Sequence, residues 1–187
     1  MAFFRHPQAL VETDDIGEGT RVWAFSHVMN GATIGRDCNI GEHCFVEKGA
    51  VLGNNVTVKN QVSIWAGVRI DEGAFIGPNA SLTNDLRPRS RQANWTLRET
   101  HIGQGATIGA NATIVCGISI GSFAFVGAGA VVTGNVRAHA LVYGNPARLH
   151  GFVCRCAEPL TFTGARGVCA ACHRQYHKDP QGYVHDA

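Results

Sequence analysis

The sequence predicts an all-β protein whose short parallel strands wind into one long coil. The first observation is a period of six, because every sixth residue from Ile16 to Leu82 is aliphatic. The second is a gap of twenty residues between Leu82 and Ile102, after which the period continues to Val132. The third is a set of paired cysteines beyond residue 150, where the period has ended. We therefore expect a repetitive coil over residues 1–150 with one ejected loop, followed by a small module over residues 151–187.

The residues before the repeat are expected to close the open end of the coil. Phe3, Phe4 and Leu10 are candidates to cover its first interior positions, since terminal repeats need atypical caps. No long apolar run occurs here, so the sequence predicts neither a signal peptide nor a membrane span. We expect a cytoplasmic protein, whose seven cysteines are thiols or metal ligands and not disulfides.

The repeat itself predicts a triangular coil. Side chains alternate along a strand, so the first and fifth residues of each hexad point to the same side. Three strands then close one turn of eighteen residues, and like residues stack in columns about 4.8 Å apart. The expected columns over residues 16–82 are Ile16, Ile34, Leu52 and Ile70; Val22, Ile40, Val58 and Ile76; and Val28, Val46, Ile64 and Leu82. The fifth residue is small or β-branched, so the interior can fill without voids.

Composition excludes one broad class of function. The chain has 187 residues, 45% of them hydrophobic, which is enough for one substantial core. Its formal net charge is only +2, so general nucleic-acid binding has no electrostatic support. The 23 glycines suit a chain that turns every few residues.

The interruption, at about residues 84–101, is expected to leave the coil as a loop. Twenty residues is not a multiple of six, and the segment is polar and rich in turn formers. Its arginines are Arg87, Arg89, Arg91 and Arg98. Arginine clusters suit phosphate and carboxylate groups, because the guanidinium fork matches two oxygens at once. A solvated charged loop would show the same composition, so both interpretations stay open.

Residues 16 to 148 resemble the left-handed parallel β-helix acyltransferases. Gly144-Asn145-Pro146-Ala147-Arg148 resembles the segment that closes the coenzyme A site in many of these acetyltransferases. Several motifs narrow the resemblance to N-acetyltransferases acting on nucleotide-linked 3-amino sugars. They are His6-Pro7, Glu12-Thr13-Asp14-Asp15-Ile16-Gly17, Trp23-Ala24-Phe25-Ser26-His27, Gly77-Pro78-Asn79-Ala80, Thr83-Asn84-Asp85, Pro88-Arg89-Ser90 and Ile108-Gly109-Ala110-Asn111-Ala112-Thr113-Ile114.

The resemblance implies an acetyl-CoA-dependent enzyme of bacterial surface polysaccharide (lipopolysaccharide and O-antigen) biosynthesis. The substrate implied first is UDP-2-acetamido-3-amino-2,3-dideoxyglucuronate, and the alternative is a dTDP-3-amino-deoxyhexose. Relatives are homotrimers that bind acetyl-CoA in the groove between neighbouring coils. The residues that the resemblance assigns to the cofactor are Gly109, Ala110, Gly127, Ala128, Asn145, Pro146 and Arg148. Glycine and alanine at such positions also serve to close the coil.

The resemblance also implies the reacting groups. Asn84 lies where related enzymes position the acceptor, and its side-chain carbonyl could hold the sugar amine, although asparagine is not a base. The proton could pass to Asp85, to water or to the departing thiolate. Many relatives use a histidine, so His27, His43 and His101 are also considered. His27 and the four arginines of the loop are the candidates for binding the sugar nucleotide.

Beyond Gly151 a second pattern begins. Cys154 and Cys156 are followed after twelve residues by Cys169 and Cys172. Two close pairs of thiols suit tetrahedral zinc, and so short a segment cannot build a core alone. The pattern resembles a zinc ribbon or rubredoxin-like knuckle, with iron as an alternative metal and His173 or His177 as a substitute ligand.

Two other classes of protein use this architecture. A metal-dependent carbonic anhydrase needs three histidines between subunits, and the histidines of this coil lack the paired spacing. A non-catalytic scaffold with a working zinc module is the second alternative, but it gives no role to the loop or to the Gly144–Arg148 segment. Binding of coenzyme A separates both from the acetyltransferase.

Overall fold

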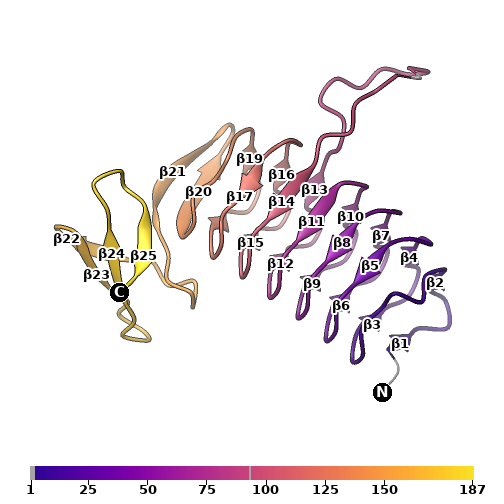
Figure 1. Cartoon of the computed structure of the whole chain (residues 1–187), viewed down its shortest axis with the longest axis horizontal. Helices are drawn as coiled ribbons and strands as arrows, with labels where there is room; N and C mark the ends of the chain where they lie inside the picture. Colours follow the sequence, from indigo (N-terminus) through magenta and orange to yellow (C-terminus); the bar gives the residue numbers. More distant parts are fainter. Residues whose placement is uncertain (1–2, 93) are drawn as a thin grey trace.

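The computed structural model describes residues 3–92 and 94–187, and within these ranges every regular element is a β-strand. Figure 1 shows a row of stacked coils, a long arm that leaves the row near its middle, and a separate small sheet at the C-terminal end. The predicted all-β coil of hexapeptide repeats is confirmed. No helix among the described residues is long and apolar enough to cross a membrane.

Three flat faces form the coil and enclose its interior. The first face consists of β1 (Phe4–Arg5), β3 (Arg21–Val22), β6 (Asn39–Ile40), β9 (Thr57–Val58), β12 (Phe75–Ile76), β15 (Thr107–Ile108), β18 (Phe125–Val126), β20 (Ala140–Gly144) and β21 (Ala147–Phe152). The second consists of β2 (Leu10–Val11), β4 (His27–Val28), β7 (Phe45–Val46), β10 (Ser63–Ile64), β13 (Ser81–Leu82), β16 (Thr113–Ile114) and β19 (Val131–Val132). The third consists of β5 (Thr33–Ile34), β8 (Val51–Leu52), β11 (Val68–Ile70), β14 (Thr100–Ile102) and β17 (Ser119–Ile120). Strands within each face are parallel, except that β20 and β21 form an antiparallel hairpin.

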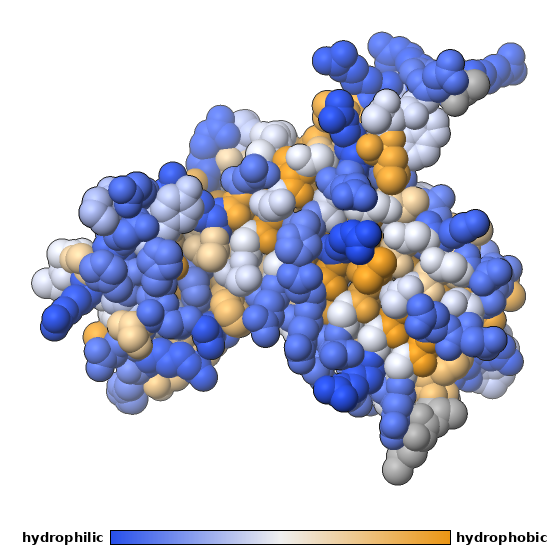
Figure 2. Space-filling view, viewed as in Figure 1, coloured by the Kyte–Doolittle hydropathy of each residue, from blue (hydrophilic) through white to orange (hydrophobic). Residues whose placement is uncertain are grey.

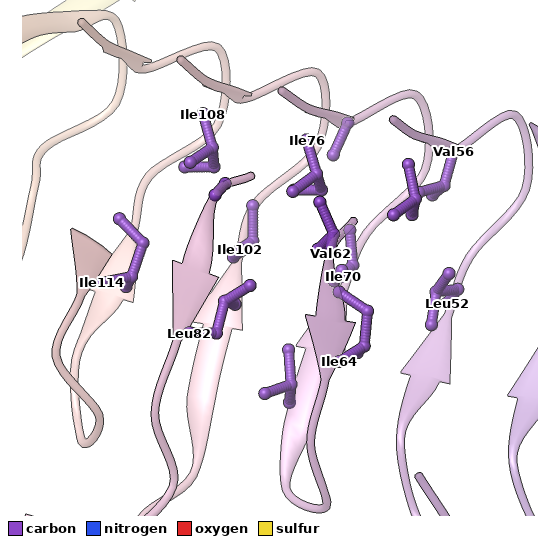
Figure 3. Packing of buried hydrophobic residues seen from close by; sticks show 14 of the residues in the cluster. Leu52, Val56, Val62, Ile64, Ile70, Ile76, Leu82, Ile102, Ile108 and Ile114 are labelled. Atoms are coloured by element: carbon purple, nitrogen blue, oxygen red, sulfur yellow. The ribbon is translucent and has the colours of Figure 1, made fainter. Parts of the chain in front are cut away.

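The interior columns follow the predicted register. Ile34 pairs with Leu52, Leu52 with Ile70, and Ile70 with Ile102 on the far side of the arm. The labelled aliphatic side chains in Figure 3 point into the same interior from successive coils. All belong to one continuous core, and each contributes roughly 1.5–3 kcal/mol of burial free energy. The coil is therefore a rigid support whose outer faces carry the variable side chains.

The corners of the coil depend on one backbone conformation. The fourth residue of each hexad has a positive φ, from Gly19 to Asn79 and again from Gly105 to Gly129. Glycine and asparagine suit this left-handed region, whereas Phe25 at φ 60° is unusual there. These turns let the chain change face after every two-residue strand.

The lead-in, which is the segment before the repeat (residues 3–15), differs in one respect from the cap that the sequence predicts. Phe4 is 45% exposed and Leu10 is 54% exposed, because each lies at the outward position of its short strand. Ala9 and Val11 pack against the core instead, and Thr13 is buried. The prediction that Phe4 and Leu10 cover the first interior positions is wrong, because the lead-in continues the strand alternation of the faces.

The C-terminal module is a four-stranded antiparallel sheet. Its strands are β22 (Thr161–Thr163), β23 (Arg166–Val168), β24 (Gln175–Lys178) and β25 (Val184–Asp186). The hydrophobic cluster of the module has the buried residues Cys154, Cys169, Tyr176 and Val184 at its centre. This core is small, and two of its four side chains are thiols.

Candidate functional site

The arm is the largest departure from the coil. The chain leaves after β13 and returns at Thr100, which pairs with Val68 on the neighbouring coil. Residues 83–99 therefore lie outside the regular strands, and Figure 1 shows them extending away from the coil. Thr100 is buried and pairs with Val68, a fifth-position residue of the preceding coil, so the interior packing continues past the arm. The rigid coil thus fixes both ends of the arm.

Several hydrogen bonds hold the base of the arm. The backbone N–H of Arg98 donates to the carbonyl oxygen of Asn84 at 2.9 Å, which joins the two branches. Trp65 Nε1 donates to the carbonyl of Leu82 at 2.8 Å. The backbone N–H groups of Cys116 and Gly117 donate to Thr83 Oγ1 and to the carbonyl of Glu99, at 2.9 and 3.1 Å. The Asn84 side chain makes no hydrogen bond to the described residues, so its amide is available to a ligand.

A cavity of about 270 Å³ lies within the arm. Its lining includes Asp85, Arg87, Arg98 and Trp95. Asp85 Oδ1 accepts a hydrogen bond from the backbone N–H of Arg87 at 2.9 Å, which turns the chain at the cavity edge. The structure thus brings together Asp85 and two of the predicted arginines, directly beside Asn84. Carboxylate, guanidinium and indole groups together suit a polar ligand that carries a planar ring.

Arg89 and Arg91 lie farther out. Both are exposed, and neither contributes to the cavity lining. Arg89 Nη1 donates to the carbonyl of Pro88 at 3.2 Å, and Arg91 has a positive φ of 61° at the turn of the arm. Figure 2 shows hydrophilic residues over most of the outer part of the arm. Within one chain these two arginines are separate from the cavity.

His27 is likewise distant from the arm in one chain. It lies on β4, and β7 and β10 separate β4 from β13 in the second face. Three strand spacings correspond to about 14 Å. His27 Nε2 lies 3.2 Å from Glu12 Oε2, outside hydrogen-bond geometry, and its ring meets Phe45 edge-on at 5.5 Å. A role for His27 beside Asn84 would therefore need a second chain.

A histidine–carboxylate pair lies where the arm returns to the coil. His101 Nε2 is 2.8 Å from Asp71 Oδ2, and both side chains are about half exposed. A carboxylate that holds one ring nitrogen orients the imidazole for proton transfer. His101 is a candidate from the sequence, whereas its partner Asp71 was not predicted. The interior columns contain a signal for this pair. Ile70 pairs with Ile102, Asp71 follows Ile70 and His101 precedes Ile102, so the two side chains belong to neighbouring coils.

The predicted cofactor glycines lie at the corner between the first and second faces. A Cβ atom on Gly109 would come within 2.5 Å of the backbone nitrogen of Ala128 in the next coil. A Cβ atom on Gly127 would lie 2.8 Å from Tyr143 Cβ. Close stacking of the coils is therefore sufficient to explain both glycines. Their assignment to the cofactor stays a prediction, together with that of Ala110.

The last coil carries a second hollow, of about 430 Å³. Its lining includes the apolar side chains of Val132, Val136 and Val142, with Arg137 and Arg148 also at the hollow. Arg148 belongs to β21, whereas Asn145 and Pro146 form the exposed turn between β20 and β21. The predicted coenzyme segment is thus divided between a hairpin tip and a basic hollow.

The four predicted metal ligands come together. The Sγ atoms of Cys154, Cys156, Cys169 and Cys172 all lie within 4.8 Å of one another. Among the residues that the structure describes, this group contains the four thiols, and His173 and His177 lie outside it on exposed positions. Elsewhere, burial raises the pKa of the Cys38 and Cys44 thiols, which fill inward positions of the coil. Within the described part of the chain, the C-terminal thiols are the group arranged as a metal-ligand set.

The repeat matches a known family. The family described as bacterial transferase hexapeptide (six repeats) matches residues 15–48, 49–84 and 99–134. The chain belongs to this family. The matched ranges omit residues 85–98, which are the part of the arm that departs from the hexapeptide pattern.

Among relatives of this hexapeptide transferase, the dTDP-3-amino-3,6-dideoxy-alpha-D-galactopyranose 3-N-acetyltransferase of Aneurinibacillus thermoaerophilus is 49% identical over 173 residues. Those residues are 92% of this chain and 90% of the relative. The acetyltransferase domain of PglB from Neisseria gonorrhoeae, in complex with acetyl coenzyme A, is 26% identical with a TM-score of 0.53. That match covers 79% of this chain and 57% of the other.

A third comparison concerns the fold alone. AntD, an N-acyltransferase from Bacillus cereus in complex with dTDP-4-amino-4,6-dideoxyglucose and coenzyme A, is 18% identical with a TM-score of 0.65. The match covers 73% of this chain and 82% of that chain. The coil of this hexapeptide transferase is therefore shared with enzymes of low sequence similarity.

Proposed function

We propose that this protein transfers the acetyl group of acetyl-CoA to the 3-amino group of a nucleotide-linked 3-amino sugar. The protein is an acyltransferase, and its relative from A. thermoaerophilus carries the proposal because the similarity extends over 90% of that enzyme. The arm supports it, since Asp85, Arg87 and Arg98 line one cavity beside Asn84. A cytoplasmic location and a role in surface polysaccharide synthesis stay predictions from the sequence.

The favoured acceptor is a dTDP-linked 3-amino-3,6-dideoxyhexose. The sequence motifs favour a UDP-linked 3-amino uronate, and the comparisons give that substrate no support. The acceptor named for the relative from A. thermoaerophilus has a neutral 6-deoxy carbon and no carboxylate. Arg87 and Arg98, the two arginines that line the arm cavity, would then bind the diphosphate, which offers paired oxygens to the guanidinium fork.

The reaction needs an uncharged amine beside the thioester carbonyl and a destination for one proton. In our proposal the Asn84 side chain accepts a hydrogen bond from the amine and directs its lone pair at the carbonyl carbon. The new C–N bond forms as the C–S bond breaks, and the thiolate of coenzyme A leaves. The amine proton passes to water or to the His101–Asp71 pair, since an imidazole held at 2.8 Å by a carboxylate can accept it.

The placement of these groups favours a homotrimer. The arm leaves the corner between the second and third faces, whereas Gly109 and Gly127 lie at the corner between the first and second faces. A full face separates the two corners in one chain. In a trimer, the arm of one chain can meet the glycine corner of its neighbour, with acetyl-CoA in the groove between them and its nucleotide near Arg148. Light scattering of the purified protein measures this assembly.

The acceptor is tested with a panel of sugar nucleotides. Purified protein and acetyl-CoA are incubated with a dTDP-3-amino-3,6-dideoxyhexose, a UDP-2-acetamido-3-amino uronate and a 3-hydroxy control, and acetylated products are identified by mass spectrometry. A detection method without thiol reagents is needed because all seven cysteines are free. Turnover of the dTDP sugar above the uronate supports the proposal, and acetylation of neither amine contradicts it.

Asn84→Ala tests the proposed site. We expect kcat to fall by about 10² or more, as for loss of a positioning contact. Arg91→Ala, on the outer arm, is the matched control and should keep kcat. An unchanged kcat and KM for the Asn84 variant would remove this residue from the site.

A further inference from the structure

The two cysteine pairs lie on tight turns that are each closed by a backbone hydrogen bond to the carbonyl of the first cysteine. Cys154 and Cys156 follow β21, and Cys169 and Cys172 connect β23 to β24. In the first turn the N–H of Ala157 donates to the carbonyl of Cys154 at 2.9 Å. In the second, the N–H of His173 donates to the carbonyl of Cys169 at 3.0 Å. Ala157 and His173 both have a positive φ, at 70° and 60°. In both turns, the residue directly after the second cysteine has the left-handed conformation that reverses the chain.

The sulfur atoms are separated by distances typical of a shared metal. Cys154 Sγ lies 3.3 Å from Cys172 Sγ, and Cys156 Sγ lies 3.6 Å from the sulfurs of both Cys169 and Cys172. A disulfide would bring two sulfurs to about 2.05 Å. Four ligands at about 2.3 Å from a tetrahedral zinc ion would lie about 3.8 Å apart. The observed spacing is close to the tetrahedral value and far from that of a disulfide.

Polar groups around the sulfurs suit a charged tetrathiolate. Arg174 Nη1 lies 3.5 Å from Cys172 Sγ, and the Tyr176 hydroxyl lies 3.1 Å from Cys154 Sγ. Four thiolates around Zn²⁺ carry a net charge of −2, and donors of this kind reduce it. The described core of the module has few apolar side chains apart from its thiols, so a metal supplies the missing stability.

From these observations we propose that the four cysteines bind one Zn²⁺ ion, and that this ion fixes the module to the last coil of the transferase. Nothing in the family match extends to this segment, because the matched residues end at 134. The site is structural, since all four positions of the tetrahedron are taken by protein ligands.

A continuous set of contacts joins the ion to the coil. The Tyr176 ring meets the His139 ring edge-on at 5.2 Å, and His139 stacks on Phe123 at 5.4 Å. The backbone of Val153, next to the first ligand, exchanges hydrogen bonds with His139 at 2.7 and 2.9 Å. Arg155, between the first two ligands, lies over the Phe123 ring at 4.8 Å and forms an ion pair with Asp186.

The same contacts reach the basic hollow of the last coil. Arg137 lines the hollow, donates to the carbonyl of Gln181 in the module at 3.0 Å and lies over the Tyr183 ring at 4.4 Å. Arg148 also lines the hollow and belongs to β21, the strand that precedes Cys154. Loss of the ion is therefore expected to release Arg137 from the module and to loosen the end of the strand that carries Arg148. This consequence rests on the proposed function, in which the hollow receives the nucleotide of coenzyme A.

Metal analysis of the full-length protein tests the site itself. Protein purified without a histidine tag should contain about one zinc per chain. Cys172→Ser should lower the zinc content and the melting temperature. Cys38→Ser is the matched control, because serine and threonine already donate to carbonyl oxygens at equivalent coil positions, as Ser26 does to Gly41 at 2.6 Å. Less than a tenth of an equivalent in the native protein, or bound iron in place of zinc, overturns the proposal.

A spectroscopic measurement on the native protein tests the site even where the cysteine variants fail to fold. The native protein is exchanged with Co²⁺, whose four-thiolate complexes give intense thiolate-to-metal absorption bands. These bands should appear with one equivalent and disappear on addition of Zn²⁺. Their absence in folded protein that has taken up cobalt contradicts a four-thiolate site. Neither metal content nor this spectrum depends on acetyltransferase activity, so the site can be judged even where the proposed function fails.

The coupling is tested by coenzyme A binding, followed by calorimetry. Folded Cys172→Ser protein is expected to bind coenzyme A roughly fivefold or more weakly than the native protein, within the usual range of coupling between two sites. Cys38→Ser should bind as the native protein does. Equal affinities in all three proteins contradict the coupling while leaving the zinc site intact.

Discussion

The coil and the C-terminal module hold short strands together by different interactions. In the coil, aliphatic side chains from successive turns form one continuous core, and Val58, Ile64 and Ile76 have no exposed surface. In the module, the buried group consists of Cys154, Cys169, Tyr176 and Val184. The coil can therefore form from its side chains alone, whereas the module is expected to require its metal. The stability of the coil should therefore depend on the packing of its side chains, and the stability of the module on the binding of the metal by its cysteines.

The largest expected effect is in the coil core. Ile64→Ala removes a fully buried side chain from the second face and should destabilise the coil by about 2–5 kcal/mol. Urea unfolding followed by circular dichroism measures the change. Ser63→Ala, at the outward position of the same strand, should change stability by less than about 0.5 kcal/mol. Zinc content should stay at one equivalent in both variants, and a loss of zinc in the Ile64 variant would show that coil and module are not separable.

Glycine-to-alanine substitutions compare the packing of the coil with the packing of the module. A Cβ on Gly35 would lie 2.5 Å from the backbone of Gly53 in the next coil, which cannot move without separating paired strands. We expect Gly35→Ala to cost about 1–3 kcal/mol. A Cβ on Gly167, in the module, would lie 2.8 Å from the ring of Phe162, a half-buried side chain that can rotate away. Gly167→Ala should cost less. Equal losses in thermal unfolding would contradict this difference.

The contact between coil and module should depend on pH through His139. Burial lowers the pKa of His139, and Asp186 and Arg155 nearby act in opposite directions. Because the folded-state pKa lies below the unfolded value of about 6.5, the stabilisation is complete above that pH. It is lost as the pH falls towards the folded-state pKa, since the unfolded chain then binds the proton first.

His139→Asn isolates this effect. Asparagine tolerates the positive φ of 61° at this corner and can donate to the Val153 carbonyl as the imidazole does. The melting temperature of the native protein should fall more steeply than that of the variant between pH 7.5 and 5.5. Parallel pH profiles for the two proteins would exclude His139 as the group responsible.

Much of the coil could be predicted because its information is local and repeated. A count of six locates the interior columns, and the corner conformation follows from the same count. The arm could be predicted only as a departure, because its polar side chains specify no period. The pairing of Asp71 with His101 was not predicted because the arm raises the separation of paired residues on neighbouring coils from 18, as for Thr33 and Val51, to 32, as for Ile70 and Ile102. The four thiols were found from their spacing.

The contacts of the module with the coil could not be predicted from local patterns. His139 lies at an ordinary corner position, where Gly, Asn or Asp also occur, and nothing beside it in the sequence indicates a partner. Its partners Val153 and Tyr176 come from a segment without a repeat. Contacts of this kind depend on how two independently patterned segments meet. The same reason applies to the lead-in, where Phe4 and Leu10 continue the strand alternation and do not cap the coil.

The smallest effect on stability is expected in the arm, because its residues belong neither to the core of the coil nor to that of the C-terminal module. Arg98 lines the arm cavity, and only its backbone joins Asn84, so Arg98→Ala should keep the fold. Its guanidinium is a candidate ligand for the diphosphate, and loss of a charged hydrogen bond should raise KM for the sugar nucleotide roughly tenfold or more. Arg91→Ala, outside the cavity, should leave KM unchanged. Steady-state kinetics at fixed acetyl-CoA measures both, and an equal rise in KM for the two variants would mean that general positive charge, and not the cavity, attracts the substrate.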